Sequence, residues 1–218
     1  LFRSKGLQYL ENYNGYCYSQ LPRKYKTRIE ETQMAVNILD SKCHELVKFD
    51  AFRRVNTGGV PLNPQEIRNS MATPDTRSLL KQMSESEEFI KATRGRVKDI
   101  RMDAQELCLR FIAFWMRYDS HSGQLSHLMA LTRMLDRTLL ELNQKKKDYH
   151  LLLCALFKNS MEKCNALFGE EAFSKEDLNL IINRPLFVSW SVVMATCTLD
   201  METLQSRRND AIELQHKY

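Results

Sequence analysis

The sequence predicts a mainly α-helical fold, a multi-helix bundle with one or two short β-strands near the N-terminus. Three observations support this prediction. Apolar residues recur at helical spacing over most of the chain after Ser41. Only seven glycines and five prolines occur in 218 residues, which argues against long flexible linkers. Hydrophobic residues make up 43% and charged residues 27% of the chain, so a real core can be buried.

One segment near the N-terminus has the pattern of a strand. In Thr32–Leu39, the apolar residues Met34, Val36 and Ile38 alternate with polar or smaller neighbours. A strand must pair with another strand to be stable. The segment therefore predicts a short strand whose partners lie elsewhere in the protein.

The first two helices after Ser41 flank a pair of glycines. The predicted helix Glu45–Val55 runs into these glycines, and a second helix covers Asn63–Met71. Asn63 is a suitable N-cap, Pro64 fits the first helical position, and Glu66 stands where a capping-box carboxylate belongs. The start of this second helix is therefore the best-defined boundary in the sequence.

Start and stop signals divide the remainder into further helices. Thr73–Pro74–Asp75 breaks the chain, Ser120–Gly123 breaks it again, and Gly169 is expected to end a long helix in the left-handed conformation. The predicted helices are Arg77–Met83 capped by Asp75 or Thr76, a short acidic turn opened by Ser84 or Ser86 and ending at Lys91, Asp103–Met116, Gln124–Leu142, Lys147–Phe168, a segment from Ser174 to Asn183, Pro185–Thr196, and a polar terminal helix capped by Asp200.

Apolar stripes along these helices predict the core. Leu107, Phe111 and Phe114 follow the spacing i, i+4, i+7, which places them on one helix face. The residues expected to be mostly buried are Leu107, Phe111, Phe114, Leu128, Leu131, Leu135, Leu153, Phe157, Phe187 and Trp190.

Cysteine and histidine usage argues against a disulfide framework and a metal site. The six cysteines contain no C-x-x-C pair, which favours a reduced, cytoplasmic setting. The five histidines are scattered without metal-ligand spacing, so no metal is assigned. The longest apolar runs, such as Leu151–Phe157, are far shorter than a membrane span, so no membrane association is expected.

The net charge of +5 is modest, but the basic residues fall in clusters. A single cluster is ordinarily a solvated face, whereas several clusters on one face would form a surface that follows DNA phosphates. A helix-turn-helix regulator fits poorly, because no short helix pair has a basic second helix next to a dimerisation segment. The candidate contacts to the DNA backbone are Arg94, Arg96, Lys98 and Arg101, together with Lys145, Lys146 and Lys147.

The segment between the first two predicted helices could position a phosphate group. Gly58 and Gly59 allow a positive φ and close approach to backbone N–H groups, and the next helix begins nearby. The alternative is that the two glycines only allow the chain to turn between the helices and bind nothing. Asn56 in turn could simply cap the loop, because asparagine hydrogen-bonds its own backbone.

Phe49–Met71, read as FDAFRRVNTGGVPLNPQEIRNSM, resembles the F-x3-N-x5-L motif of the N-terminal domain of GmrSD-type restriction endonucleases. Members of that family typically read F-x-R-hydrophobic-N-T-G-G-x-x-L-N-x-Q-E-I-R-N. The motif positions are Phe52, Asn56 and Leu62, and further residues in register are Arg54, Gly58, Gly59, Gln65, Glu66, Ile67 and Arg68.

Four other segments resemble the same family, so the resemblance covers most of the chain. LENYNGYCYSQLP (Leu10–Pro22) resembles its L-x-x-L-N-G-x-x-Y-x-x-L-P segment, and RMDAQELCLRFIAFW (Arg101–Trp115) resembles its R-M-x-x-x-E-L-x-L-R-F helix. LFGEEAF (Leu167–Phe173) and NRPLFVSW (Asn183–Trp190) resemble its C-terminal helical part.

The family's D-G-Q-Q-R motif, associated with nucleotide hydrolysis, does not occur in this sequence, and neither does a His-Asn-His nuclease motif. We therefore expect the chain to be part of a longer protein. Residues 1–72 are expected to complete a ParB/sulfiredoxin-like NTPase-type subdomain, which would also supply partners for the predicted strand. Residues 73–218 are expected to form a helical subdomain.

The resemblance implies that this chain is part of an NTP-dependent anti-phage restriction protein. The implied partners are DNA and a nuclease domain or subunit. The implied nucleotide- or phosphate-binding residues are Phe52, Arg54, Asn56, Gly58, Gly59 and Leu62, and the implied cofactor is an NTP bound by the full-length protein. No catalytic residue is assigned, and the chain alone is expected to be inactive. The alternative is a non-catalytic helical scaffold, or a module that binds DNA or a partner.

Overall fold

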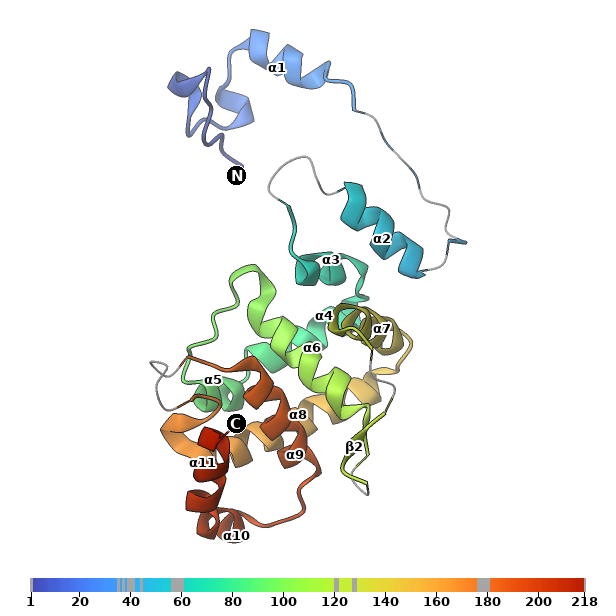
Figure 1. The fold of residues 1–218 in the computed structure, drawn as a ribbon. Coiled ribbons are helices and arrows are strands. Elements are labelled where there is room, and N and C mark those ends of the chain that lie inside the picture. Colours follow the sequence, from blue (N-terminus) through green and yellow to red (C-terminus); the bar gives the residue numbers. More distant parts are fainter. Residues whose placement is uncertain are drawn as a thin grey trace. The chain divides into compact units, whose positions relative to one another are not determined.

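The computed structural model describes the chain except for residues 1, 35, 37, 39–41, 44, 56–60, 120–121, 127–128, 176–180 and 218. The predicted fold class is confirmed, because the described residues are mainly α-helical and contain a single two-stranded antiparallel sheet (Figure 1). Within the described ranges, none of the helices combines the length and apolar character needed to cross a membrane.

The chain forms two compact units, Leu1–Lys42 and Cys43–Tyr218. The first unit contains the 3₁₀-helices η1 (Glu11–Tyr13) and η2 (Tyr18–Gln20) and the helix α1 (Arg23–Glu30). The ring of Tyr13 meets those of Tyr16 and Tyr25 edge-on, at centroid distances of 5.6 and 5.1 Å. A small aromatic cluster therefore takes the place of a larger core in this unit.

The second unit is the helical bundle. Its longest helix, α8 (Lys147–Phe168), packs against α4, α5, α9, α10 and α11. In Figure 1, α9 lies beside both α6 and α8. The other elements are α2 (Glu45–Val55), α3 (Pro64–Met71), α4 (Pro74–Ser84), α5 (Glu87–Thr93), η3 (Ile100–Met102), α6 (Asp103–Trp115), β1 (Tyr118–Asp119), β2 (Gln124–Leu125), α7 (Leu131–Asn143), η4 (Gly169–Glu171), α9 (Arg184–Thr196), α10 (Met201–Ser206) and α11 (Arg208–Lys217).

The boundary between the two compact units falls after Lys42, and the subdomain boundary expected at residue 72 stays a prediction. Helix α3 packs against α2, α6 and α7, so both helices of the motif belong to the same compact unit as the rest of the bundle. Ion pairs of Arg53 and Arg68 with Asp136 connect α2 and α3 to α7.

Phenylalanines from four parts of the bundle form the centre of its core. The ring of Phe157 on α8 lies 5.0 Å from that of Phe111 and 5.8 Å from that of Phe89. Phe187 on α9 meets the Phe89 ring at 6.0 Å. Of the residues predicted to be buried, Leu107, Phe111, Leu135, Leu153, Phe157 and Phe187 are, whereas Phe114, Leu131 and Trp190 are half-buried against the core and Leu128 lies outside the described residues.

Several predicted helix starts are confirmed by their caps, whereas residues 176–180 of the predicted segment from Ser174 to Asn183 lie outside the described residues. Ser86 caps α5, and Asp200 caps α10 by accepting from the Thr203 N–H at 2.7 Å. The cap predicted for α4 is wrong: Thr73 caps a helix that begins at Pro74, so Asp75 and Thr76 lie in its first turn. Gly169 ends α8 with a φ of 57°, but its ψ of −120° is not that of the left-handed helix.

The strands lie elsewhere than predicted. Thr32–Met34, Val36 and Ile38 are not in a strand, and Met34, Val36 and Ile38 are 82, 75 and 89% exposed. The described residues offer this segment no partner strand, and an unpaired strand is not stable.

The hairpin formed by β1 and β2 corrects a second expectation. It pairs Tyr118 with Leu125 and Asp119 with Gln124, and Gly123 turns the chain with a φ of 65°. Gln124 and Leu125 were predicted to begin a helix, but the helix α7 starts only at Leu131. Cross-strand pairing at the hairpin therefore replaces the first turns of the predicted helix.

Candidate functional site

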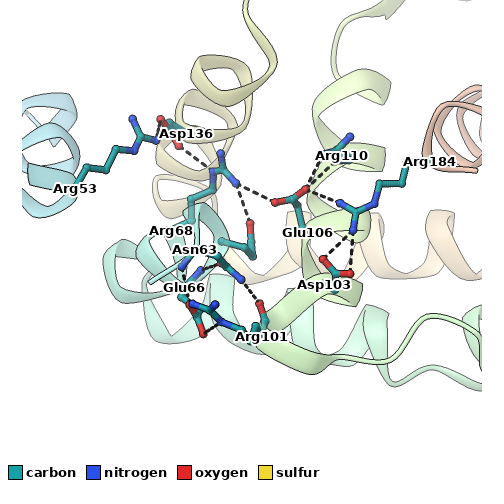
Figure 2. A network of polar contacts seen from close by, with 11 residues as sticks. Arg53, Asn63, Glu66, Arg68, Arg101, Asp103, Glu106, Arg110, Asp136 and Arg184 are labelled. Atoms are coloured by element: carbon teal, nitrogen blue, oxygen red, sulfur yellow. Dashed lines mark hydrogen bonds and ion pairs between the residues drawn. The ribbon is translucent and has the colours of Figure 1, made fainter. Parts of the chain in front are cut away.

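The candidate site is the frame that holds the segment between α2 and α3, and Figure 2 shows the polar contacts that build it. Asn56, Gly58 and Gly59 lie outside the described residues. The structure describes the other motif residues: Phe52 is 39% and Leu62 38% exposed, and Arg54 is exposed. The large apolar side chains of the motif are therefore only partly covered.

The start of α3 carries the predicted capping box. The Asn63 Oδ1 atom accepts from the Glu66 N–H at 2.8 Å, and the Glu66 carboxylate accepts from the Asn63 N–H at 2.7 Å. Both contacts follow from the N-P-Q-E sequence, in which an asparagine cap is followed three residues later by a glutamate. The helix boundary predicted at Asn63 is confirmed.

Arg101 joins this cap to the residues that precede it. Its Nη2 atom donates to the Pro61 carbonyl and to Glu66 Oε2, both at 2.6 Å, and its Nε atom donates to Glu66 Oε1 at 3.1 Å. In return, Asn63 Nδ2 donates to the Arg101 carbonyl at 2.7 Å. We call Pro61, Asn63, Glu66 and Arg101 the clamp, because together they fix the chain where it enters α3.

The backbone is strained at Arg101 and at the residue that follows it. Arg101 and Met102 have φ values of 55° and 66°, in the left-handed region that residues with a Cβ rarely adopt. Such a conformation persists only where the surrounding contacts impose it. The hydrogen bonds of the Arg101 carbonyl and guanidinium are contacts of this kind.

Glu66 already occupies the N-terminus of α3 with a negative charge. The Arg101 guanidinium, and then the Asn63 N–H, hold the pKa of the Glu66 carboxyl below its ordinary value. A capped helix start beside two glycines predicts a site for an external anion, but in the structure the chain supplies its own carboxylate there. An anion bound by this segment would therefore have to rely on groups other than the α3 cap.

We expect the charge of Glu66 to stabilise the protein above its ordinary pKa of 4.5 and to lose this effect as the pH falls. The carboxyl pKa is lower in the folded than in the unfolded chain, so lowering the pH through both values removes the difference. Glu66→Gln keeps the capping geometry without the charge. Urea unfolding should show wild type more stable than Glu66→Gln at pH 7, with the gap shrinking at pH 3. An equal gap at both pH values would contradict this assignment.

Asn63→Ala should lower the free energy of unfolding by about 1 kcal/mol, the usual effect of a lost N-cap. The substitution removes the bond to the Glu66 N–H and the bond to the Arg101 carbonyl. Asn69→Ala, within the same helix, is the matched control and should be neutral or slightly stabilising, because alanine favours helix interiors. Equal unfolding curves for Asn63→Ala and Asn69→Ala would show that the cap contributes nothing.

A buried ion-pair network holds α2 and α3 on the bundle. Arg68, only 1% exposed, donates from Nε to Asp136 Oδ1 at 2.8 Å. Arg53 of α2 donates from Nη2 to Asp136 Oδ2 at 2.6 Å. Burial lowers the pKa of Arg68 while Asp136 opposes that shift, and an arginine remains charged at neutral pH. Asp136 therefore pairs with guanidinium groups from two helices.

Glu106 extends the network to α6 and α9. It lies 3.5 Å from Arg68 Nη1, accepts from Arg110 Nη2 at 2.7 Å and accepts from Arg184 Nη1 at 3.2 Å. Arg184 also donates to both oxygens of Asp103 at 2.9 Å. The network thus connects α2, α3, α6, α7 and α9 (Figure 2).

The chemistry of this network is that of a scaffold. Asp136 and Glu106 are both paired with arginines, so neither carboxylate is free to act as a general base. Burial raises the pKa of the Cys108, Cys154 and Cys164 thiols, which keeps them protonated and poorly nucleophilic. Among the described residues, no group of three or more His, Cys, Asp or Glu side chains could hold a metal ion.

The two predicted basic clusters lie at opposite ends of α8. Arg94 donates to Glu170 at 3.1 Å, just beyond the C-terminus of α8, whereas Lys146 and Lys147 lie at its N-terminus. A helix of 22 residues is about 33 Å long. The clusters therefore do not form one compact patch.

Individual basic residues differ in their availability. Arg101 belongs to the clamp, while Arg96 and Lys98 are exposed and line a cavity of about 340 Å³. Lys145, Lys146 and Lys147 are also exposed, and Lys145 Nζ lies 5.1 Å from the centroid of the Tyr149 ring. Arg96, Lys98, Lys146 and Lys147 are exposed candidate DNA contacts whose side chains have no hydrogen bond or ion pair among the described residues.

A scan against protein-family models, a search of curated proteins and a search of solved structures each find no match to this chain. The resemblance to the GmrSD-type family therefore rests on the sequence segments themselves.

Sequence reasoning missed the network around Asp136. Asp136 lies 68 residues from Arg68, and no local pattern connects them. The only sequence feature that marked these positions as important was their match to the family motif, at Gln65, Glu66, Ile67 and Arg68. In the structure, Gln65, Ile67 and Arg68 are buried and Glu66 completes the clamp, so this part of the motif serves the fold.

Proposed function

We propose that this chain is the helical region of an NTP-dependent, GmrSD-like anti-phage restriction protein, where it completes a nucleotide-hydrolysing and DNA-sensing domain. One observation carries the proposal: both flanks of residues 56–60 are tied to the helical bundle. On one side Arg53 pairs with Asp136, and on the other Arg101 holds Pro61. A segment that positions a phosphate group needs fixed ends, because small displacements of a reacting group lower the rate strongly.

In this proposal the residues of the motif have two kinds of role. Gln65, Ile67 and Arg68 hold the frame, whereas Asn56 contacts the nucleotide and Gly58 and Gly59 allow a phosphate to approach the backbone. Arg54, which is exposed, adds positive charge. Groups for the hydrolytic step, and most of the NTP site, come from the N-terminal ParB/sulfiredoxin-like subdomain.

The proposed partners are DNA and a nuclease domain or subunit, in a cytoplasmic setting. The exposed Arg96 and Lys98, and the exposed lysines at the start of α8, would contact DNA phosphates at separate points. A cytoplasmic setting agrees with six cysteines that are all free in the structure.

A second candidate function is a non-catalytic scaffold that binds DNA or a partner protein. The filled N-terminus of α3 favours it, because Glu66 and Arg101 neutralise each other where an external phosphate was expected. In that case residues 56–60 serve only to turn the chain.

An assay of nucleotide hydrolysis by the complete protein distinguishes these two functions. We expect the product of the full reading frame to hydrolyse a nucleoside triphosphate, and the 218-residue chain alone to release no phosphate. The control is the same preparation heated above its unfolding transition. If the folded full-length protein neither binds nor hydrolyses any of the common nucleoside triphosphates, the NTP-dependent function is wrong and the scaffold function is supported.

A further inference from the structure

A second cavity, separate from the clamp, lies between α2 and the α7 region. Its volume is about 390 Å³, within the usual range for sites that hold small molecules. Leu46 and Phe49 of α2 and Met129, just before α7, form its apolar wall. The cavity can therefore cover an apolar group of modest size.

Three arginines line the same cavity. Arg133 and Arg137 are four residues apart on α7, so their side chains extend from the same helix face. Arg53 adds a third guanidinium from the last turn of α2. Guanidinium groups bind carboxylates and phosphates through paired hydrogen bonds, and two on one face are suited to a single oxyanion.

The acidic residues nearby leave positive charge in excess. Asp136 is shared by Arg53 and Arg68 at 2.6 and 2.8 Å, so one carboxylate faces two guanidinium groups. Asp50 lies 3.5 Å from Arg53 but is 70% exposed, where solvent screens its charge.

The two arginines of α7 add to this excess. Arg137 has a partner in Glu141 at 3.2 Å. The side chain of Arg133 has no hydrogen bond or ion pair within the part of the chain that the structure describes. One guanidinium at the cavity is thus uncommitted.

We propose that this cavity binds a small organic oxyanion, a phosphate or carboxylate carried on an apolar group. Arg133 and Arg137 bind the oxyanion, Arg53 contributes attraction from the opposite wall, and Leu46 and Met129 contact the apolar group. The site does not depend on the proposed function, because it uses neither residues 56–60 nor nucleotide hydrolysis.

The test is a titration of the protein, labelled with ¹³C at its methionine methyl groups, with phenyl phosphate and with benzoate. Met129 lines the cavity, whereas Met83 is fully buried and is not among the lining residues. We expect both probes to shift the Met129 methyl resonance in a saturable way and to leave that of Met83 in place. Inorganic phosphate, which lacks the apolar group, should bind more weakly than phenyl phosphate. The ratio of the two organic affinities tells whether the site prefers phosphate or carboxylate.

Arg133→Gln should weaken binding of the preferred probe about tenfold, since hydrogen bonds to charged groups contribute that much or more. Arg77→Gln removes one exposed arginine from α4, away from the cavity, and should bind like wild type. The proposal fails if neither probe shifts Met129 at millimolar concentration, or if Arg133→Gln and Arg77→Gln bind the probe equally well.

Discussion

Asp136→Asn should lower the free energy of unfolding by about 3–5 kcal/mol, the usual effect of removing one partner from a buried ion pair. Asp136 is 2% exposed and accepts hydrogen bonds from Arg68 and Arg53, so the substitution leaves two guanidinium groups without their carboxylate. Arg68 is buried too, and apart from position 136 its side-chain contacts among the described residues are longer, 3.3 Å to Gln65 and 3.5 Å to Glu106. The midpoint of urea unfolding gives the loss directly, provided the slope is unchanged.

Glu85→Gln is the matched control for this prediction. Glu85 pairs with Lys81 at 3.8 Å on the surface of α4, where both side chains are about two-thirds exposed, so its loss should cost less than about 1 kcal/mol. The double variant Arg68→Met, Asp136→Leu should recover much of the stability, because apolar residues can replace a buried pair. A loss below 1 kcal/mol for Asp136→Asn would show that the network does not hold the helices together.

Phe157→Ala should cost about 3–5 kcal/mol, the usual range when a large core side chain is truncated. Phe157 is fully buried at the middle of α8, and its ring contacts those of Phe89 and Phe111. The loss has two parts. The variant lacks the free energy that the wild type gains when the ring is transferred from water to the core, and the cavity left in the core adds a further cost.

Phe52→Ala makes the same chemical change at an exposed position. Phe52 is 39% exposed on α2, so we expect a loss much smaller than for Phe157→Ala when both are measured by urea unfolding. Equal losses for the two variants would mean that Phe52 is covered in solution. Phe52 is also a motif position, so a stable Phe52→Ala protein separates its functional role from its packing.

The sequence predicted helix boundaries well where the residues of a local motif contact one another. The N-P-Q-E sequence at Asn63 specifies the capping box with residues only three positions apart, and the structure forms it. The same reasoning could have placed the start of α4, because Thr73–Pro74 repeats the cap–proline order of Asn63–Pro64. The error there came from choosing a cap after the proline.

Features that depend on distant partners could not be predicted. The alternation in Thr32–Leu39 describes a strand only if another strand lies beside it, and the described residues provide none. The pairing of Arg68 with Asp136 joins α3 to α7, and Arg101 reaches Glu66 across 35 positions. Charged residues at such positions resemble solvated residues in the sequence, although in the structure they hold the frame of the motif.

The proposed function also predicts how changes within the motif differ. Gly59→Val should harm the full-length protein more than Asn56→Ala, because a β-branched side chain resists a positive φ and blocks close approach to the backbone. Asn56→Ala removes only a polar group from a loop, so the fold should be kept. If residues 56–60 only turn the chain, both variants lose stability, and the folded fraction of each hydrolyses nucleotide normally.

In the proposed function, the clamp and the network hold the frame while Asn56 contacts the nucleotide. Nucleotide turnover per folded molecule of full-length Asn56→Ala distinguishes this role from a purely structural one, with the melting temperature measured on the same sample. The matched control is Asn209→Ala, an exposed asparagine of α11. We predict an unchanged melting temperature and a turnover lowered about tenfold or more, as for a lost hydrogen bond to a charged group. Normal turnover in an equally stable Asn56→Ala protein would contradict the claim.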